Sequence, residues 1–149
     1  TAWQLYNSAK KYIGNGTITL GAGVFKMVLA ETSSNASTFT LSTYASVTSE
    51  IAATGGYVTG GKNLVPATAQ WVTGASAKQL KFTMSAVGLP FTASGASLTN
   101  IRYAILRNST GATAGKLLCF CQLSSAQFTV TSPNTLTVLP AATGIFTLT

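Results

Sequence analysis

The stretch Ile101-Arg102-Tyr103-Ala104-Ile105-Leu106-Arg107 decides the fold class of this chain. Its large residues Ile101, Tyr103 and Ile105 alternate with Arg102 and Ala104. A period of two is typical of a β-strand, because successive side chains of a strand point to opposite faces of the sheet. We therefore predict a strand here and place the other elements around it.

A second strand is expected shortly after the first. Residues 108–115 are short and polar and include two glycines, which favour a turn. Residues 116–123 then carry apolar side chains on both faces, a pattern typical of a strand in the middle of a packed sheet. Residues 100–123 are thus predicted to form a central β-hairpin whose tip, residues 108–115, is mobile and exposed.

The rest of the chain indicates many short strands and one helix. Thr1 is expected to cap a helix over residues 2–13, which Gly14 to Gly16 would stop. Apolar stretches separated by turn residues predict further strands at 17–20, 24–30, 47–51, 66–72, 80–84, 87–91, 128–131, 136–139 and 145–148. We expect an all-β chain: one domain over 1–149, an antiparallel β-sandwich or jelly-roll-like barrel, with a short N-terminal helix within 1–13 and strands within 17–149.

Charge is scarce in this chain and almost all of one sign. Only 7% of the 149 residues are charged, and 9 Lys and Arg against 2 Asp and Glu give a net charge of +7. Such a chain is drawn to acidic partners. The cations are spread along the sequence without interleaved aromatic residues, so a specific nucleic-acid site is not expected. No membrane span and no signal peptide is expected either, which favours synthesis in a cytoplasm.

The residues that usually carry catalysis are almost absent. The chain has no His and no Asp, and its only carboxylates are Glu31 and Glu50. Cys119 and Cys121 lie two apart on a predicted strand, so two reduced, buried thiols are expected rather than a bridge or a metal site. The glycine-rich segment 53–64 lacks the spacing of a phosphate-binding loop. We predict no enzyme activity, no cofactor and no metal.

The remaining candidates for function are contacts with other molecules. Exposed tryptophan is enriched at the centres of protein interfaces. The candidate protein-interface residues are Trp3, Tyr6, Lys10, Lys11 and Trp71. The alternative is a carbohydrate-binding β-sandwich, in which Trp3, Trp71 or Tyr57 would stack on sugar rings.

Several segments taken in order resemble small virion structural proteins of tailed bacteriophages. The matching segments extend along nearly the whole chain and are Leu5-Tyr6-Asn7-Ser8-Ala9-Lys10, Gly16-Thr17-Ile18-Thr19-Leu20, Phe25-Lys26-Met27-Val28-Leu29, Gly56-Tyr57-Val58-Thr59-Gly60-Gly61, Arg102-Tyr103-Ala104-Ile105-Leu106-Arg107 and Gly144-Ile145-Phe146-Thr147-Leu148-Thr149. Proteins of that family are usually acidic and carry Asp in several turns, whereas this chain has no Asp.

The resemblance implies a non-enzymatic part of a phage particle, assembled in the bacterial host cytoplasm and located in the virion. One placement is a capsid decoration or cement protein that binds the major capsid protein and stabilises the shell. The alternative is a tail, collar or fibre-associated subunit. In either place we expect other virion proteins and further copies of this chain as partners, with the N-terminal helix and exposed strand edges making the contacts.

Overall fold

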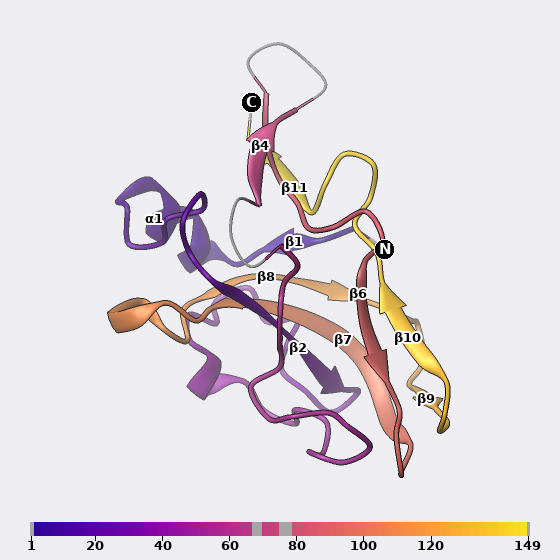
Figure 1. Ribbon diagram of the computed structural model, residues 1–149. Coiled ribbons are helices and arrows are strands. Elements are labelled where there is room, and N and C mark those ends of the chain that lie inside the picture. The colour runs from indigo at the N-terminus through magenta and orange to yellow at the C-terminus, as the bar shows by residue number, and fades with distance from the viewer. Residues whose placement is uncertain (1, 67–69, 75–78, 149) are drawn as a thin grey trace.

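The computed structural model describes residues 2–66, 70–74 and 79–148. These residues form an all-β structure with several antiparallel sheets and one short α-helix near the N-terminus, as the sequence predicts (Figure 1). In chain order the elements are β1 (Gln4–Leu5), α1 (Asn7–Gly14), β2 (Phe25–Glu31), a 3₁₀ turn (Tyr44–Ser46), β3 (Lys62–Asn63), β4 (Trp71–Thr73), β5 (Leu80–Phe82), β6 (Leu89–Thr92), β7 (Leu98–Asn108), a second 3₁₀ turn (Gly111–Thr113), β8 (Leu117–Gln122), β9 (Phe128–Val130), β10 (Thr135–Val138) and β11 (Phe146–Leu148).

Strand β7 lies in the middle of the largest sheet, whose order is β1-β8-β7-β2-β3. Its neighbours β2 and β8 are both antiparallel to it, and β9 pairs with its first residues. Ile105 of β7 lies between Val28 of β2 and Phe120 of β8, and all three side chains are buried. The predicted central hairpin is therefore confirmed, with both faces of β7 and β8 in the core.

The tip of that hairpin is exposed at residues 110–112 and tied to the body by hydrogen bonds. Asn108 is 1% exposed, and its side-chain oxygen accepts a hydrogen bond of 2.9 Å from the backbone N–H of Thr110. The Thr110 hydroxyl in turn accepts one of 2.7 Å from the backbone N–H of Val24, which precedes β2. These bonds fix the tip against the start of the neighbouring strand.

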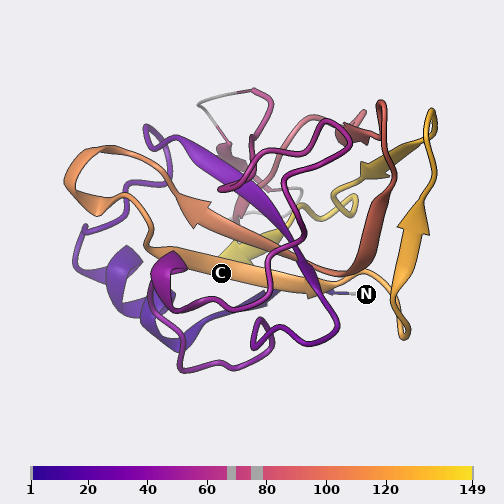
Figure 2. The ribbon, with the colours of Figure 1, turned by 90° about the horizontal axis from the view of Figure 1, so that it is seen from below.

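Residues 32–61 form a layer of loops over one face of the large sheet, and Figure 2 shows them crossing in front of β2, β7 and β8. Side chains anchor this layer: the hydroxyl of Tyr6 donates a hydrogen bond of 2.7 Å to the carbonyl of Ala36, and Phe39 packs edge-on against Phe120. The ring of Tyr6 also packs against Phe120. The loop layer is thus held against the sheet by aromatic contacts as well as by isolated bridges.

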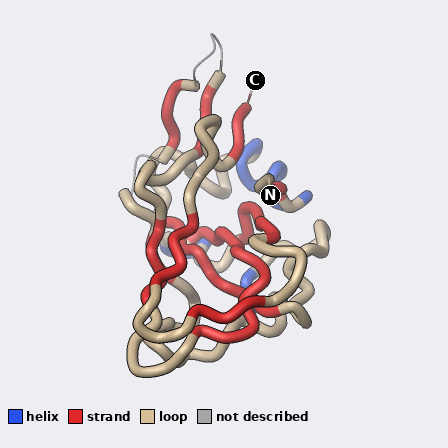
Figure 3. The backbone as a smooth tube through the Cα atoms, turned by 90° about the vertical axis from the view of Figure 1, so that its right-hand side faces the viewer, coloured by secondary structure: helices blue, strands red, loops and turns tan. Residues whose placement is uncertain are grey.

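Two smaller sheets complete the fold. Strand β6 pairs with β10, and the order β11-β5-β4 forms a three-stranded sheet that projects from the body, here called the arm (Figure 3). Phe82 of the arm packs edge-on against Phe25 of β2, and Phe146 stacks on Phe82. Further out on the same face, the register partners Leu80 and Leu148 are 41% and 40% exposed. The apolar face of the arm therefore continues beyond the core into solvent.

The predicted helix over residues 2–13 is wrong in its first half. Gln4 and Leu5 form β1 and pair with Phe120 and Cys119 of β8, so the helix begins at Asn7. The apolar spacing of Leu5 and the residues after it fits a helix, but the exposed edge of β8 offers backbone hydrogen bonds that a short isolated helix end does not. The proposed Thr1 cap lies outside the described residues.

Two of the predicted strands are not formed. Residues 17–20 are turns, in which the backbone N–H of Ile18 bonds to the carbonyl of Tyr12 at the end of α1. Residues 47–51 contribute only an isolated bridge between Glu50 and Ala30. At 17–20 buried side chains alternate with exposed ones, but no ladder to a neighbouring strand is formed there. Residues 47–51 lie beside β2, and Ser49, with φ +52°, interrupts the extended backbone that a strand would need. Of the predicted strand at 66–72, residues 67–69 lie outside the described residues, and β4 begins at Trp71.

The closest approach of the loop layer to the large sheet is at Gly61 and gives a test of the fold. Gly61 has φ +81°, and a Cβ there would collide with the backbone carbonyl of Met27. Gly16 has φ +73° with no atom within 4 Å of its Cβ position. Gly16→Ala should thus lower the free energy of unfolding by about 1–2 kcal/mol, because alanine is strained in a left-handed conformation. Gly61→Ala should lower it by a further ~1–3 kcal/mol, because of the clash. Urea unfolding measures both, and equal losses would contradict the close approach.

Candidate functional site

A half-buried carboxylate among hydroxyl groups holds the glycine-rich loop in place. Glu50 accepts hydrogen bonds from the hydroxyls of Tyr44 and Tyr57, the latter at 2.6 Å, and from the backbone N–H of Gly60 at 2.8 Å. The Tyr57 hydroxyl also accepts a bond of 3.1 Å from the backbone N–H of Leu29 in β2. The one carboxyl group therefore connects three separate segments of the loop layer to the sheet.

Arg107 of β7 completes this arrangement from the sheet side. Its guanidinium donates two hydrogen bonds to the carbonyl of Gly60, at 3.1 Å and 2.8 Å, and lies 4.4 Å from the centre of the Tyr44 ring. Both the N–H and the carbonyl of Gly60 are thus hydrogen-bonded. Its φ of +89° is a conformation that favours glycine. We call Glu50, Tyr44, Tyr57, Gly60 and Arg107 the Glu50 cluster.

The surroundings of the two tyrosines keep both of them protonated. Burial, followed by the hydrogen bond to Glu50, raises the pKa of Tyr44 to about 12. The same two causes, burial first, raise the pKa of Tyr57 far above the ordinary value of 10.0. Both groups therefore act as hydrogen-bond donors to the carboxylate, and neither is placed to give up a proton near neutral pH.

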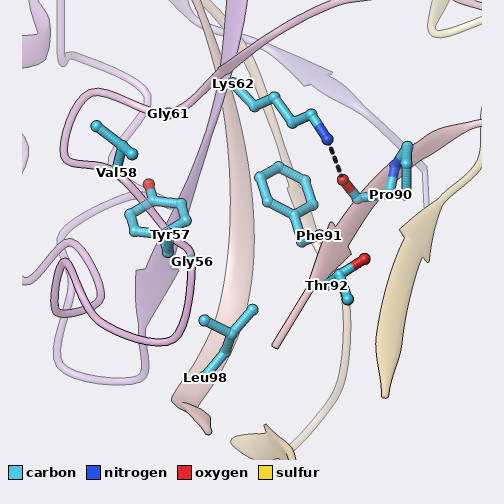
Figure 4. A pocket seen from close by; sticks show the side chains of 9 residues that line it. All are labelled: Gly56, Tyr57, Val58, Gly61, Lys62, Pro90, Phe91, Thr92 and Leu98. Atoms are coloured by element: carbon cyan, nitrogen blue, oxygen red, sulfur yellow. Dashed lines mark hydrogen bonds between the residues drawn. The ribbon is translucent and has the colours of Figure 1, made fainter. Parts of the chain in front are cut away.

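Tyr57 of the Glu50 cluster lines one side of a groove (Figure 4). Tyr57 and Val58 of the glycine-rich loop lie on one side, Phe91 of β6 lies on the other, and Leu98 of β7 lies between them. Lys62 of β3 extends along one end of the groove. The cavity measures about 360 Å³, within the size range of ligand pockets. A mainly apolar groove with a single cation is suited to binding rather than to bond-breaking.

The structure separates the five predicted interface residues. Lys10 and Lys11 are exposed on α1, as the prediction requires. Trp3 is half-buried and lines a second hollow together with Phe128. Trp71 is half-buried at the base of the arm, 6.2 Å from the ring of Phe146.

Tyr6 is a correction to the predicted interface. Its side chain is 0% exposed, its hydroxyl is bonded to Ala36, and burial raises its pKa far above the ordinary value. As a surface contact this prediction is wrong, because Tyr6 follows β1 directly and so points into the core instead of outward from a helix. Sequence reasoning in turn missed Lys62 and Phe91 as residues of one groove, since they come from separate segments.

The three aromatic residues of the carbohydrate alternative do not share a surface. Tyr57 is 6% exposed and lines the groove, whereas Trp3 and Trp71 line two other, separate hollows. A stacking platform for sugar rings needs two or three aromatics on one exposed face.

The described residues also settle how the potential metal ligands, the two thiols and the helical segments are placed. In the described part of the chain, no three His, Cys, Asp or Glu side chains gather into a group that could hold a metal ion. Cys119 and Cys121 are buried, as predicted, and burial raises the pKa of both thiols. None of the helical segments described has the length and apolar character needed to cross a membrane.

No protein-family model, no curated protein sequence and no solved structure matches this chain. The function is accordingly argued from the charges, surfaces and contacts described above.

The raised pKa of Tyr44 in the Glu50 cluster predicts that alkaline pH destabilises the fold. A tyrosine of the unfolded chain loses its proton near pH 10, whereas Tyr44 in the folded chain loses it near pH 12. Its contribution to stability is thus fully present below pH 10 and is lost as the pH rises from 10 to 12. Urea unfolding at pH 9, 10 and 11 should show the decline, and it should be shallower in Tyr44→Phe. Absorbance at 295 nm should show Tyr6, Tyr44 and Tyr57 ionising later than in the urea-unfolded chain, and identical titration curves would contradict the prediction.

Proposed function

We propose that this chain is a non-enzymatic structural component of a tailed-bacteriophage particle, a capsid decoration or cement protein that binds the shell of major capsid protein. The resemblance of its segments to small virion structural proteins supports this proposal. The observation that carries it is the placement of charge: Lys10, Lys11 and Lys62 are exposed, while the carboxylate of Glu50 is bonded within the fold.

The distribution of charge favours an acidic partner. Lys10, Lys11 and Lys62 are exposed, whereas the carboxylate of Glu50 already accepts three hydrogen bonds. Among the described side chains, Glu31 is then the one carboxylate left to face a partner, at the end of β2. A surface of this kind binds poorly to copies of itself through charge and well to an acidic surface.

The arm adds apolar contact area to this charged surface. Leu80 and Leu148 are register partners on its outer part, and Val72 lies on the opposite face, 36% exposed. Apolar side chains that project from the body are suited to burial against a neighbouring subunit, whether the capsid shell or another copy of the chain. On a shell that repeats the same site many times, weak contacts of this kind act together.

The first test is the location of the chain. Mass spectrometry of purified particles should find it in many copies, and electron cryomicroscopy should show it on the outer surface of the head. Density at the tail, collar or fibres would support the alternative placement in the same particle. Presence in infected cells combined with absence from mature particles would contradict a structural role in the virion.

The second test concerns the exposed cations of α1. Lys10→Gln/Lys11→Gln removes two positive charges, and each exposed charge pair contributes roughly 0.2–1 kcal/mol. Binding to shells that lack the chain should therefore weaken about 2- to 30-fold in a co-sedimentation assay at low salt. Wild-type binding should also weaken as NaCl is raised.

A matched control for that test lies on the connection between β10 and β11. Ala142→Glu/Thr143→Glu changes the net charge by the same two units at exposed positions away from α1. It should weaken binding much less than the lysine variant. Equal losses would mean that net charge alone matters, and α1 would then not be a contact surface.

A further inference from the structure

The groove beside the Glu50 cluster has an apolar interior that is already formed. Tyr57, Phe91 and Leu98 are 6%, 5% and 2% exposed, and the rings of Tyr57 and Phe91 lie 6.2 Å apart. Val58 stands at the rim and is 69% exposed. Because the hydrogen bonds of Tyr57 to Glu50 and Leu29 fix the loop side, a ligand would meet a preorganised surface.

The charge at the end of the groove is held in a defined position. The ammonium group of Lys62 donates a hydrogen bond of 2.8 Å to the carbonyl of Pro90, across the groove (Figure 4). An ammonium group has three N–H donors, so two remain for a ligand. Neither carboxylate of the chain lines the groove. The site thus offers an oriented cation next to apolar side chains and lacks a negative charge.

The strands on either side point to a peptide as the ligand. Lys62 lies on β3, which is the last strand of the large sheet, and Phe91 lies on β6, which has β10 as its strand neighbour. The groove is therefore bordered by two strand edges, where an extended peptide can find backbone partners. Pro90 lacks an N–H and its carbonyl is bonded to Lys62, which limits such pairing to a short segment.

A second copy of this chain is a poor occupant. The carboxylate of Glu50 is bonded within its own chain, which leaves Glu31 as the one carboxylate available among the described side chains, against a net charge of +7. A flexible acidic segment is not found among the described residues. The complementary ligand must come from a molecule with more carboxylates.

We propose that the groove binds a short extended segment of another protein, in which an apolar side chain enters the groove over Tyr57, Phe91 and Leu98 and an adjacent carboxylate binds Lys62. That the other protein belongs to the same particle rests on the proposed function above. The groove gives the acidic partner a defined contact, separate from α1.

The test uses the full chain, labelled with ¹⁵N, and the peptide acetyl-Gly-Phe-Asp-Val-Gly-amide. Titration should shift the backbone amide signals of Val58, Lys62 and Thr92. The peptide with Asn in place of Asp should bind about tenfold more weakly, since it loses a charge-assisted hydrogen bond. Lys62→Gln should bind the Asp peptide as weakly as the wild type binds the Asn peptide.

Two matched variants keep the outcome interpretable. Lys11→Gln removes the same charge from an exposed site on α1 and should leave peptide binding unchanged. Val58→Ser should weaken the binding of both peptides, whereas Val87→Ser, at a position 79% exposed outside the groove, should not. Near-UV circular dichroism should show the native fold for all four variants.

Three results would overturn the inference. The first is equal binding of the Asp and Asn peptides, and the second is equal binding of hexanoate, which would make the groove a site for a free carboxylate ligand. The third is a concentration-dependent shift of the same signals without peptide, which would make a second copy the occupant. If the peptide binds as expected but the chain is missing from particles, the groove is a peptide-binding site and only the proposed function is contradicted.

Discussion

The structure depends on strand β7, which is paired on both sides and buried on both faces. Its eleven residues are long enough to pair with β9 at one end and with β2 and β8 along the rest. Apart from Leu98 at its start, which lines the groove, the buried part of β7 offers little surface for binding. Function must therefore lie in what is attached around the large sheet: the loop layer over one face, the arm, and the edges at β1 and β3. The extreme shortness of those edge strands, two residues each, leaves little backbone exposed for unwanted pairing.

The loop layer pairs with the large sheet only at isolated bridges such as that of Glu50 with Ala30, and the Glu50 cluster adds the side-chain bonds that hold it in place. A carboxylate buried without partners would cost far more than it contributes, so its position requires the donors that Tyr44, Tyr57 and the backbone of Gly60 supply. Arg107 then fixes the same loop from β7. One consequence is structural, because the loop is held against the sheet. The other concerns the groove, because one of its walls is part of the same network and so inherits its rigidity.

The sequence predicts the elements that bury both faces and misses those that depend on distant partners. The hairpin of β7 and β8 follows from local alternation, because apolar side chains on both faces of a strand suit only a sheet interior. Residues 47–51 lie beside β2 but form only one bridge to it, since Ser49 has φ +52°, which the local apolar pattern does not reveal. The groove was beyond prediction, because Lys62 and Phe91 are brought together only by the return of the chain through the arm.

The placement of the two carboxylates connects this architecture with the proposed role. In a chain with a net charge of +7, each exposed carboxylate would bind a neighbouring cation and reduce the attraction to an acidic partner. The half-buried carboxylate of Glu50 is instead bound by hydrogen bonds within the fold, where it stabilises the loop. The exposed cations Lys10, Lys11 and Lys62 are then left for other molecules, and they lie on separate elements, α1 and β3. A chain that contacts an acidic surface at two places is oriented on that surface as well as bound to it. A single charge contact would leave the chain free to rotate about that contact.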